Sequence, residues 1–240
     1  MDASSSGVGT GHENQILAKS KISFDAPVLV VKHPIIDKVI TDKGGEMFRQ
    51  NTFWHAYAVA TALLEQFKFN TPTLISFPRG GVATGLACQL AFREQEHHFF
   101  TFPFGETGMK ENLAVPPSIS ATSDVVLIDG VIATGSTLMN YLEKIIRSVK
   151  GWQGRLFVIS NMAAERGINT IKTYSQTRGV PLACIATGWL IPAEECEWKV
   201  LDGKRVYFVG VKESIGDFGD MMISGLSANE LKHWRGPVDK

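Results

Sequence analysis

The sequence predicts an α/β fold: a parallel sheet with helices on both faces. Short apolar runs typical of buried strands alternate along the chain with segments whose apolar residues recur at helical spacing. The chain has 240 residues, 44% of them hydrophobic, which is enough for one sizeable core. Right-handed crossovers place the carboxyl ends of such strands along one edge. Arg79 and Asp129 each come shortly after a strand-like run, so we expect one crevice to hold both.

Strands and helical segments are expected to alternate over most of the chain. Residues 103–122 are rich in proline, glycine and polar groups and are expected to form an extended loop or mobile arm. Strands are predicted at 28–31, 74–77, 97–102, 125–128, 156–160 and 182–187, and helices at 46–68 (one or two), 82–92, 136–149 and 163–176.

Residues 193–212 interrupt this alternation. Two alternating apolar segments flank Asp202-Gly203, which is a strong hairpin signal. The hairpin is expected either to form a hood over a bound base or to decorate the edge of the fold. We predict a flexible N-terminal tail over residues 1–22, which are mostly polar and rich in glycine and serine, and a single domain over residues 23–240.

Composition excludes several classes of function. Lysine plus arginine and aspartate plus glutamate number 24 each, and no basic face suggests a nucleic-acid surface. The three cysteines (Cys88, Cys184 and Cys196) are widely spaced and fit neither a disulfide framework nor a zinc site. No apolar run reaches membrane-spanning length, and the first residues carry no signal pattern. A cytoplasmic enzyme without nucleic-acid or membrane partners is therefore expected.

The segment 124–137, DVVLIDGVIATGST, is the most informative one. A strand is expected to end on Asp129, followed by a small-residue loop and a helix that starts near Ser136. Loop amides and the positive end of that helix can hold a phosphate, and Asp129 can accept hydrogen bonds from ribose hydroxyls. The hydroxyls of Thr134, Ser136 and Thr137 add donors. The alternative is an ordinary tight strand–helix connection. The nucleoside-triphosphate loop is excluded because GxxxxGK[ST] is absent.

The stretch DGVIATGST resembles the phosphoribosyl-diphosphate loop of type I phosphoribosyltransferases. The stretch has a single acidic residue before ATGST, and in this it is most similar to the uracil phosphoribosyltransferases. These carry proline at the position of Gly130. Three further segments match that family in the required order: His33-Pro34, Arg79-Gly80-Gly81 as the pyrophosphate loop, and residues 214–220 (SIGDFGD) as the uracil loop. The resemblance covers roughly residues 30–225.

The resemblance implies a type I phosphoribosyltransferase-like fold and the transfer of phosphoribose from phosphoribosyl diphosphate to uracil. The products would be uridine monophosphate and pyrophosphate, as in pyrimidine salvage. It further implies Mg²⁺ held mainly through the substrate, and a homo-oligomer, either a dimer or a tetramer. The implied catalytic residues are Arg79, Asp129 and Asp217. The implied donor-binding residues are Arg79, Gly80, Gly81, Asp129, Gly130, Val131, Ile132, Ala133, Thr134, Gly135, Ser136, Thr137 and Asp217, and the base contacts are Val211, Gly216, Asp217 and Phe218.

Two departures from the family pattern keep other functions open. The family carries a Tyr-Arg pair where this chain reads FPFGET at 102–107, and Lys110 is the nearest cation. The family's arginine after the uracil loop is also missing, because Asp220 is followed by Met221. One alternative is a transferase for another pyrimidine-like base. The other is a non-catalytic protein that binds a sugar phosphate or nucleotide and regulates a partner.

Overall fold

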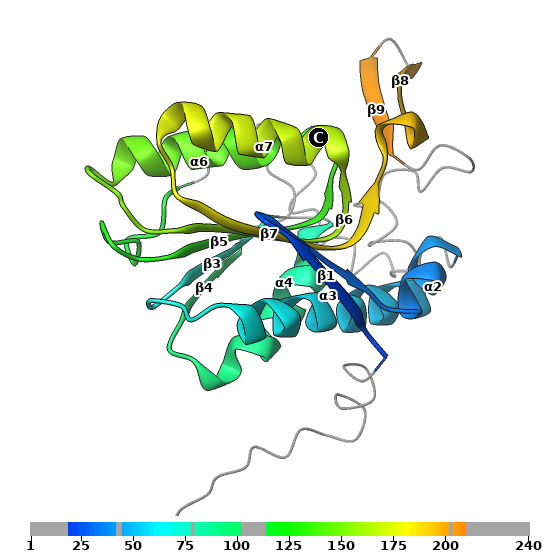
Figure 1. Cartoon of the computed structure of the whole chain (residues 1–240), viewed down its shortest axis with the longest axis horizontal. Coiled ribbons are helices and arrows are strands. Elements are labelled where there is room, and N and C mark those ends of the chain that lie inside the picture. The colour runs from blue at the N-terminus through cyan, green and yellow to red at the C-terminus, as the bar shows by residue number, and fades with distance from the viewer. Residues whose placement is uncertain (1–18, 42–44, 78–79, 102–113, 202–203, 210–240) are drawn as a thin grey trace, which may run out of the picture.

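The computed structural model describes residues 19–41, 45–77, 80–101, 114–201 and 204–209. Seven strands form one sheet in the order β1-β2-β7-β6-β5-β3-β4, and every neighbouring pair is parallel except β1 and β2 (Figure 1). The predicted α/β class is confirmed. The strands are β1 (Lys21–Asp25), β2 (Val28–Lys32), β3 (Thr73–Ser76), β4 (His98–Thr101), β5 (Val125–Ile132), β6 (Leu156–Ala164) and β7 (Leu182–Ile191).

Helices cover both faces of this sheet, as predicted (Figure 1). On one face lie α6 and α7, and on the other lie α3 and α4, with the short α2 beside α3. The helices are α2 (Ile35–Thr41), α3 (Gly45–Gln66), α4 (Gly81–Ala91), α6 (Ser136–Ser148) and α7 (Glu165–Arg178), with single 3₁₀ turns at Phe92–Glu94 and Ala193–Glu195.

The central strands are buried on both faces, which is why β5 and β6 read as nearly continuous apolar runs. Leu127 and Val158 face α6 and α7, whereas Ile128 and Ile159 face α3 and α4. Two apolar cores, one on each side of the sheet, therefore hold β5 and β6 in place. The positions of the carboxyl ends of these strands are fixed by this packing.

Close packing of α4 on β3 depends on a small residue. A Cβ atom at Gly85 would lie 2.3 Å from Ser76 Oγ, a distance that no real Cβ contact shows. The helix predicted over 82–92 is confirmed as α4. Its small residues allow it to approach the sheet closely. None of the helices in the described part of the chain is long and apolar enough to cross a membrane.

The hairpin predicted around Asp202-Gly203 is present as β8 (Cys196–Leu201) and β9 (Lys204–Val209), which pair antiparallel from Cys196 with Val209 to Leu201 with Lys204. It forms a separate two-stranded sheet beyond the end of β7 (Figure 1). The Arg166 guanidinium of α7 lies 5.6 Å from the centre of the Trp198 ring, which fastens the hairpin to the helix layer.

Strand β1 and helix α2 were not among the predicted elements. The β1 sequence KISFD alternates polar and apolar residues, and all of its side chains are exposed because it lies at the sheet edge. Of the predicted arm at 103–122, residues 103–113 lie outside the described residues, and 114–122 contain neither helix nor strand.

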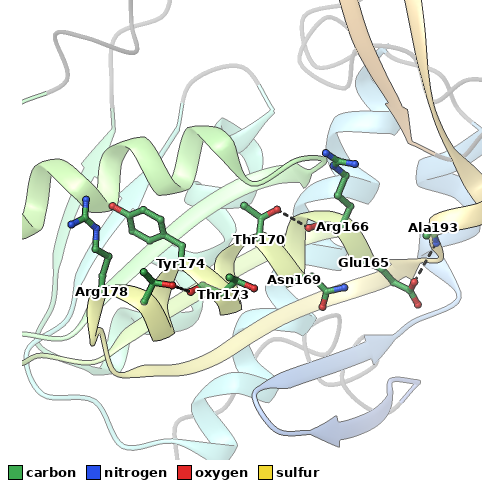
Figure 2. A pocket seen from close by; sticks show the side chains of 9 residues that line it. Glu165, Arg166, Asn169, Thr170, Thr173, Tyr174, Arg178 and Ala193 are labelled. Atoms are coloured by element: carbon green, nitrogen blue, oxygen red, sulfur yellow. Dashed lines mark hydrogen bonds between the residues drawn. The ribbon is translucent and has the colours of Figure 1, made fainter.

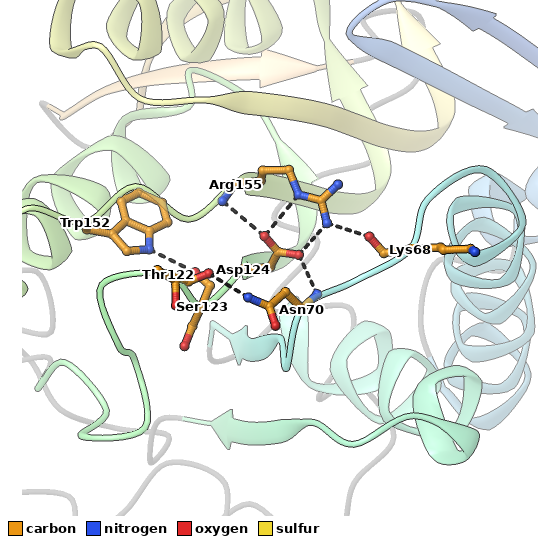
Figure 3. A network of polar contacts seen from close by, with 7 residues as sticks. All are labelled: Lys68, Asn70, Thr122, Ser123, Asp124, Trp152 and Arg155. Atoms are coloured by element: carbon orange, nitrogen blue, oxygen red, sulfur yellow. Dashed lines mark hydrogen bonds and ion pairs between the residues drawn. The ribbon is translucent and has the colours of Figure 1, made fainter.

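A polar network ties together the amino ends of the central strands (Figure 3). The Asp124 carboxylate, only 3% exposed, accepts hydrogen bonds from the backbone amides of Asn70 (2.8 Å) and Arg155 (3.1 Å). The Arg155 guanidinium adds two contacts to it, at 3.1 and 2.6 Å, and donates to the Lys68 carbonyl. Trp152 donates to the Ser123 carbonyl (2.9 Å). This network lies at the opposite end of the strands from the predicted loops.

We predict that Asp124→Ala lowers the free energy of unfolding by about 2 kcal/mol, because two partly buried amides lose their acceptor and Arg155 loses its buried carboxylate partner. Urea denaturation measures this loss. The matched control is Glu94→Ala, which removes an exposed ion pair with Arg93 and should cost less than about 1 kcal/mol. Equal losses in the two variants would contradict the assigned role of Asp124.

Candidate functional site

Two chain segments converge at the carboxyl edge of the sheet. Strand β3 ends at Ser76, and the next amide, that of Phe77, donates to the Ile128 carbonyl of β5 (3.0 Å). A Cβ atom at Gly81 would lie 3.1 Å from the Ile128 carbonyl oxygen and 3.6 Å from the Asp129 Cα. Gly81 therefore packs directly against the start of the 129–137 segment. A Cβ atom at this position would require the strand to yield by a few tenths of an ångström.

Strand β5 is longer than predicted, and this corrects the expected loop. Asp129 lies within β5, opposite Ser160 of β6, and the strand continues to Ile132. The loop between β5 and α6 is therefore only residues 133–135. The reason is that β6 runs alongside as far as Ala164 and supplies hydrogen-bond partners up to Ile132. Ile132 is 1% exposed, so its side chain belongs to the core and only its main chain is open to a ligand role.

Strand β5 is also irregular at this level. Leu127 and Ile132 both join the apolar cluster beneath α6 and α7, although a regular strand would place them on opposite faces. Asp129 lies between these two residues. It is half-buried, and its Oδ1 accepts a hydrogen bond from the Gly130 amide (2.7 Å).

The 133–135 loop is a tight turn that leads into α6. Gly135 has a left-handed backbone with φ of 76° and immediately precedes α6. The Thr134 and Ser136 hydroxyls lie 3.0 Å apart, and the Ser136 amide donates to Thr134 Oγ1 (3.4 Å). The first helical hydrogen bond runs from the Met139 amide to the Gly135 carbonyl (3.0 Å). The amides of the first turn thus point out of the helix, and no acidic residue in that turn competes for them.

The first turn of α7 fixes the shape of this loop. A Cβ atom at Gly167 would lie 2.7 Å from the Ala133 carbonyl oxygen, and one at Gly135 would lie 3.0 Å from the Gly167 carbonyl oxygen. Two glycines from distant parts of the sequence therefore let α7 rest against the loop. Sequence reasoning did not identify Gly167, because nothing in its neighbours indicates the contact.

A chain of buried polar side chains lies behind the glycine pair. His55 of α3, Asn161 of β6 and Thr84 of α4 are all fully buried. His55 Nδ1 donates to Asn161 Oδ1 (2.7 Å), Asn161 Nδ2 donates to Thr84 Oγ1 (2.7 Å), and Thr84 Oγ1 donates to the Gly80 carbonyl (3.4 Å). Burial lowers the pKa of His55 to about 4, only partly offset by the hydrogen bond with Asn161. His55 is therefore neutral at physiological pH.

His33, the first residue of the His-Pro pair, has a local structural role. It is buried, its Nδ1 accepts from the Ile35 amide (3.0 Å), and its carbonyl accepts from the Ile36 amide (3.0 Å). These two contacts begin helix α2. His33 also acts electrostatically on His55 and lowers its pKa further.

A shallow groove of about 850 Å³ runs along the outer side of α7 (Figure 2). Many of its polar groups already have partners: the Thr170 and Thr177 hydroxyls donate to helix carbonyls, and Glu165 accepts from the Ala193 amide. Arg178 and Tyr174 both contact Glu143. None of the residues predicted to bind substrate lines this groove. It is lined by Glu165, Arg166, Asn169, Thr170, Thr173, Tyr174, Thr177, Arg178 and Ala193.

Several predicted site residues lie outside the described residues. They are Arg79 of the pyrophosphate loop, Lys110 of the arm, the donor contact Asp217 and the base contacts Val211, Gly216 and Phe218. Cys88 and Cys184 are buried, and burial raises the pKa of the Cys184 thiol to about 12 and that of Cys88 further. Both thiols therefore stay protonated and serve as core residues.

No protein-family model matches this sequence, and no curated protein is significantly similar to it. Solved structures do resemble the chain. The AQ2163 protein from Aquifex aeolicus superposes with a TM-score of 0.56 at 15% identity, over 81% of this chain and 97% of that one. At this identity the likeness concerns the fold alone.

The similar solved structures also include phosphoribosyltransferases. The adenine phosphoribosyl transferase of Trypanosoma brucei, solved with AMP, pyrophosphate and ribose-5-phosphate, gives a TM-score of 0.45 at 12% identity, over 89% of this chain and 98% of that one. The adenine phosphoribosyltransferase of Leishmania tarentolae gives 0.44 at 16% identity, over 72% and 95%. Membership of the uracil-specific family stays a prediction.

We predict that Gly135→Ala destabilises the protein more than Gly179→Ala. Both glycines have left-handed backbones, with φ of 76° and 65°, so both substitutions carry a strain of about 1–2 kcal/mol. Only Gly135 also meets a neighbour, the Gly167 carbonyl, whereas a Cβ at Gly179 meets open space. Urea denaturation should show an additional loss of about 1 kcal/mol for Gly135→Ala. Indistinguishable losses would mean that α7 does not brace the loop.

The lowered pKa of His55 predicts a pH-dependent stability. Between pH 6.5 and about 4 the unfolded chain binds a proton at His55 that the folded protein does not, so stability falls as the pH is lowered through this window. The loss attributable to His55 reaches roughly 3 kcal/mol. His55→Gln keeps a hydrogen-bond donor for Asn161 but removes the titratable group that takes up the proton. The free energy of unfolding of this variant should vary less steeply with pH, because unfolding takes up as many as one proton fewer. An unchanged slope would contradict the lowered pKa of His55.

Proposed function

We propose that this chain transfers a phosphoribosyl group from phosphoribosyl diphosphate to a nitrogenous base, and that uracil is the acceptor. The observation that carries the proposal is the convergence of Gly81 with Asp129 at the edge of the sheet, next to the turn that precedes α6. One compact site thus offers a place for a diphosphate, a ribose diol and a 5′-phosphate. These are the three parts of the donor.

The proposed roles follow from the chemistry of each group. Main-chain amides at 133–137 and the N-terminus of α6 bind the 5′-phosphate, assisted by the Thr134, Ser136 and Thr137 hydroxyls. The Asp129 carboxylate accepts hydrogen bonds from the ribose hydroxyls. Arg79 and the amides of Gly80 and Gly81 receive the diphosphate, the leaving group.

The reaction passes through a cation-like sugar and requires little covalent help. It needs the base and the anomeric carbon to be held in line, the charge on the departing diphosphate to be stabilised, and water to be excluded. The structure supports the positioning of the donor most directly, because two apolar cores hold β3 and β5, the strands that carry both loops. A fixed site avoids the cost of reorganising these groups during the reaction.

Magnesium fits this site as a substrate-bound ion. In the described ranges no cluster of three histidine, cysteine or acidic residues could form a protein cage, and Asp129 is the carboxylate at the converging loops. Mg²⁺ commonly binds through one or two carboxylates, substrate phosphates and water. When bound, it would neutralise charge on the diphosphate, while Asp129 orients the diol.

The preference for uracil rests on residues 211 and 216–218. A rigid loop that offers a main-chain N–H to the 4-oxo group and a carbonyl to N3–H would read the uracil edge. Cytosine has the opposite pattern and would leave buried groups unpaired, at about 1–3 kcal/mol for each group. Three other expectations likewise remain proposals. They are the cytoplasmic location, the homo-oligomer, and the division of the chain into a tail over residues 1–22 and a single domain over residues 23–240.

A second candidate is a non-catalytic protein that binds the sugar phosphate and regulates a partner. The observation that favours it is the sequence 102–107, which lacks the arginine that the family uses on the diphosphate. Lys110 supplies a charge there but cannot form the same bidentate contact. Such a protein would bind the donor tightly without releasing pyrophosphate.

We predict that the purified protein releases pyrophosphate when given Mg²⁺, phosphoribosyl diphosphate and uracil. Adenine, hypoxanthine, cytosine and orotate complete the panel, and calorimetry measures donor binding in parallel. Asp129→Ala should lower turnover by about 100-fold, because the diol loses its anchor. The matched control is Asp25→Ala on the exposed edge strand, which should not change turnover.

The outcomes separate the candidates. Release with another base alone would replace uracil as the acceptor, and donor binding without release from any base would favour the regulatory protein. Absence of donor binding, or full activity in Asp129→Ala, would refute the proposed site.

A further inference from the structure

The buried chain His55–Asn161–Thr84 ends on the main chain of the proposed diphosphate loop. Its three side chains come from α3, β6 and α4, and they cross the interior between the sheet and these helices. All three are fully buried, and buried polar side chains are costly unless they are well paired. The last contact is not with another side chain but with the Gly80 carbonyl.

The hydrogen bonds in this chain run in one direction. The Asn161 side chain faces His55 Nδ1 with its oxygen and Thr84 Oγ1 with its nitrogen, so the neutral His55 is the tautomer that donates through Nδ1. Thr84 Oγ1 thus accepts from Asn161, and its own proton is directed to the Gly80 carbonyl. Asn161 is the residue that sets this direction, because its side chain has one accepting and one donating end.

The position of the His55 ring is enforced by the neighbouring strand. A Cβ atom at Gly188 of β7 would lie 1.7 Å from His55 Cε1 and 2.0 Å from Nε2, so glycine leaves the slot that the ring fills. The ring is therefore held by packing on one side and by Asn161 on the other.

Fixing the Gly80 carbonyl also fixes the amide that follows it. The carbonyl of one residue and the N–H of the next belong to one planar group and point in opposite directions. Holding the Gly80 carbonyl inward, toward Thr84, therefore turns the Gly81 N–H outward at the beginning of α4. The next peptide group is held as well, because Ser76 Oγ donates to the Gly81 carbonyl (2.8 Å).

We infer that His55, Asn161 and Thr84 are positioning residues that orient the glycine pair for the diphosphate of the donor. This inference rests on the proposed function, since it assigns a role to residues behind the same site. It predicts that removing a hydrogen bond of the His55–Asn161–Thr84 chain weakens binding of the diphosphate end of the donor and leaves binding of the 5′-phosphate end unchanged. A purely structural role would affect both ends alike, through general loss of folded protein.

The test compares Thr84→Val with Thr84→Ser. Valine keeps the shape and removes the hydroxyl, whereas serine keeps the hydroxyl. Calorimetry measures the dissociation constants of pyrophosphate and of ribose 5-phosphate, each with Mg²⁺, for the wild type and both variants at a temperature where all are folded. We expect Thr84→Val to weaken pyrophosphate binding about tenfold, the effect of one hydrogen-bonded group, and ribose 5-phosphate binding less than twofold. Thr84→Ser should stay close to the wild type.

Asn161→Asp supplies an independent variant. Its carboxylate accepts from both His55 and Thr84, which takes the Thr84 proton away from the Gly80 carbonyl. It should therefore reproduce the selective loss of pyrophosphate binding, although its contact with His55 remains.

Equal weakening of both ligands, or pyrophosphate binding unchanged in Thr84→Val and Asn161→Asp, would overturn the positioning role while leaving the proposed function intact. A wild type that binds neither ligand would refute the proposed function and this inference together. The two failures are thus distinguishable by the wild-type measurement alone.

Discussion

The parallel pairing of β5 with β6 beyond the end of β3 is the constraint on which the site depends. β3 stops at Ser76, level with Ile128, whereas β5 and β6 continue side by side to Ile132 and Ala163. This extension carries Asp129 past its shorter neighbour and leaves room for the Gly80-Gly81 turn beside it. The extension of β5 also shortens the loop between β5 and α6 to three residues, so α6 begins directly after this loop. Loss of this pairing would separate the elements that the proposed donor must contact together.

Polar residues interrupt the buried strands at the same level as Asp129. In β6, Ser160 and Asn161 lie between apolar residues and are fully buried, and Ser160 donates to Thr187 of β7 (3.1 Å). A core strand gains nothing in stability from such residues unless they are fully paired. Here Ser160 links β6 to β7, and Asn161 donates to Thr84, whose hydroxyl contacts the Gly80 carbonyl.

Much of the fold follows from local pattern. The apolar runs of β3, β5, β6 and β7 and the spacing in α6 are strong signals, and Asp202-Gly203 indicated the hairpin correctly. The strand β1 was missed because an exposed edge strand such as KISFD resembles a polar tail. The end of β5 was misplaced because Gly130 resembles the start of a loop, whereas its strand identity is imposed by pairing with β6.

The site was less accessible to sequence reasoning than the fold. The motif segment identified Asp129 and the turn before α6, because the residue types there carry the chemistry directly. Gly167, Gly188 and the His55–Asn161–Thr84 chain act through contacts between residues far apart in the sequence, and one sequence offers no local sign of them. His55 lies in the helix predicted over 46–68, and the apolar spacing of that helix indicates burial but gives no sign of the hydrogen bond to Asn161.

The central claim is that one crevice holds a 5′-phosphate and a diphosphate at two adjacent loops. Amide chemical shifts of isotope-labelled protein test it most directly, as ribose 5-phosphate and pyrophosphate are added separately with Mg²⁺. The account predicts that ribose 5-phosphate shifts the amides of residues 133–137 and that pyrophosphate shifts those of Gly80 and Gly81, with both sets shifting for phosphoribosyl diphosphate. Shifts elsewhere, for example along the outer groove of α7, with both loops unaffected, would contradict it.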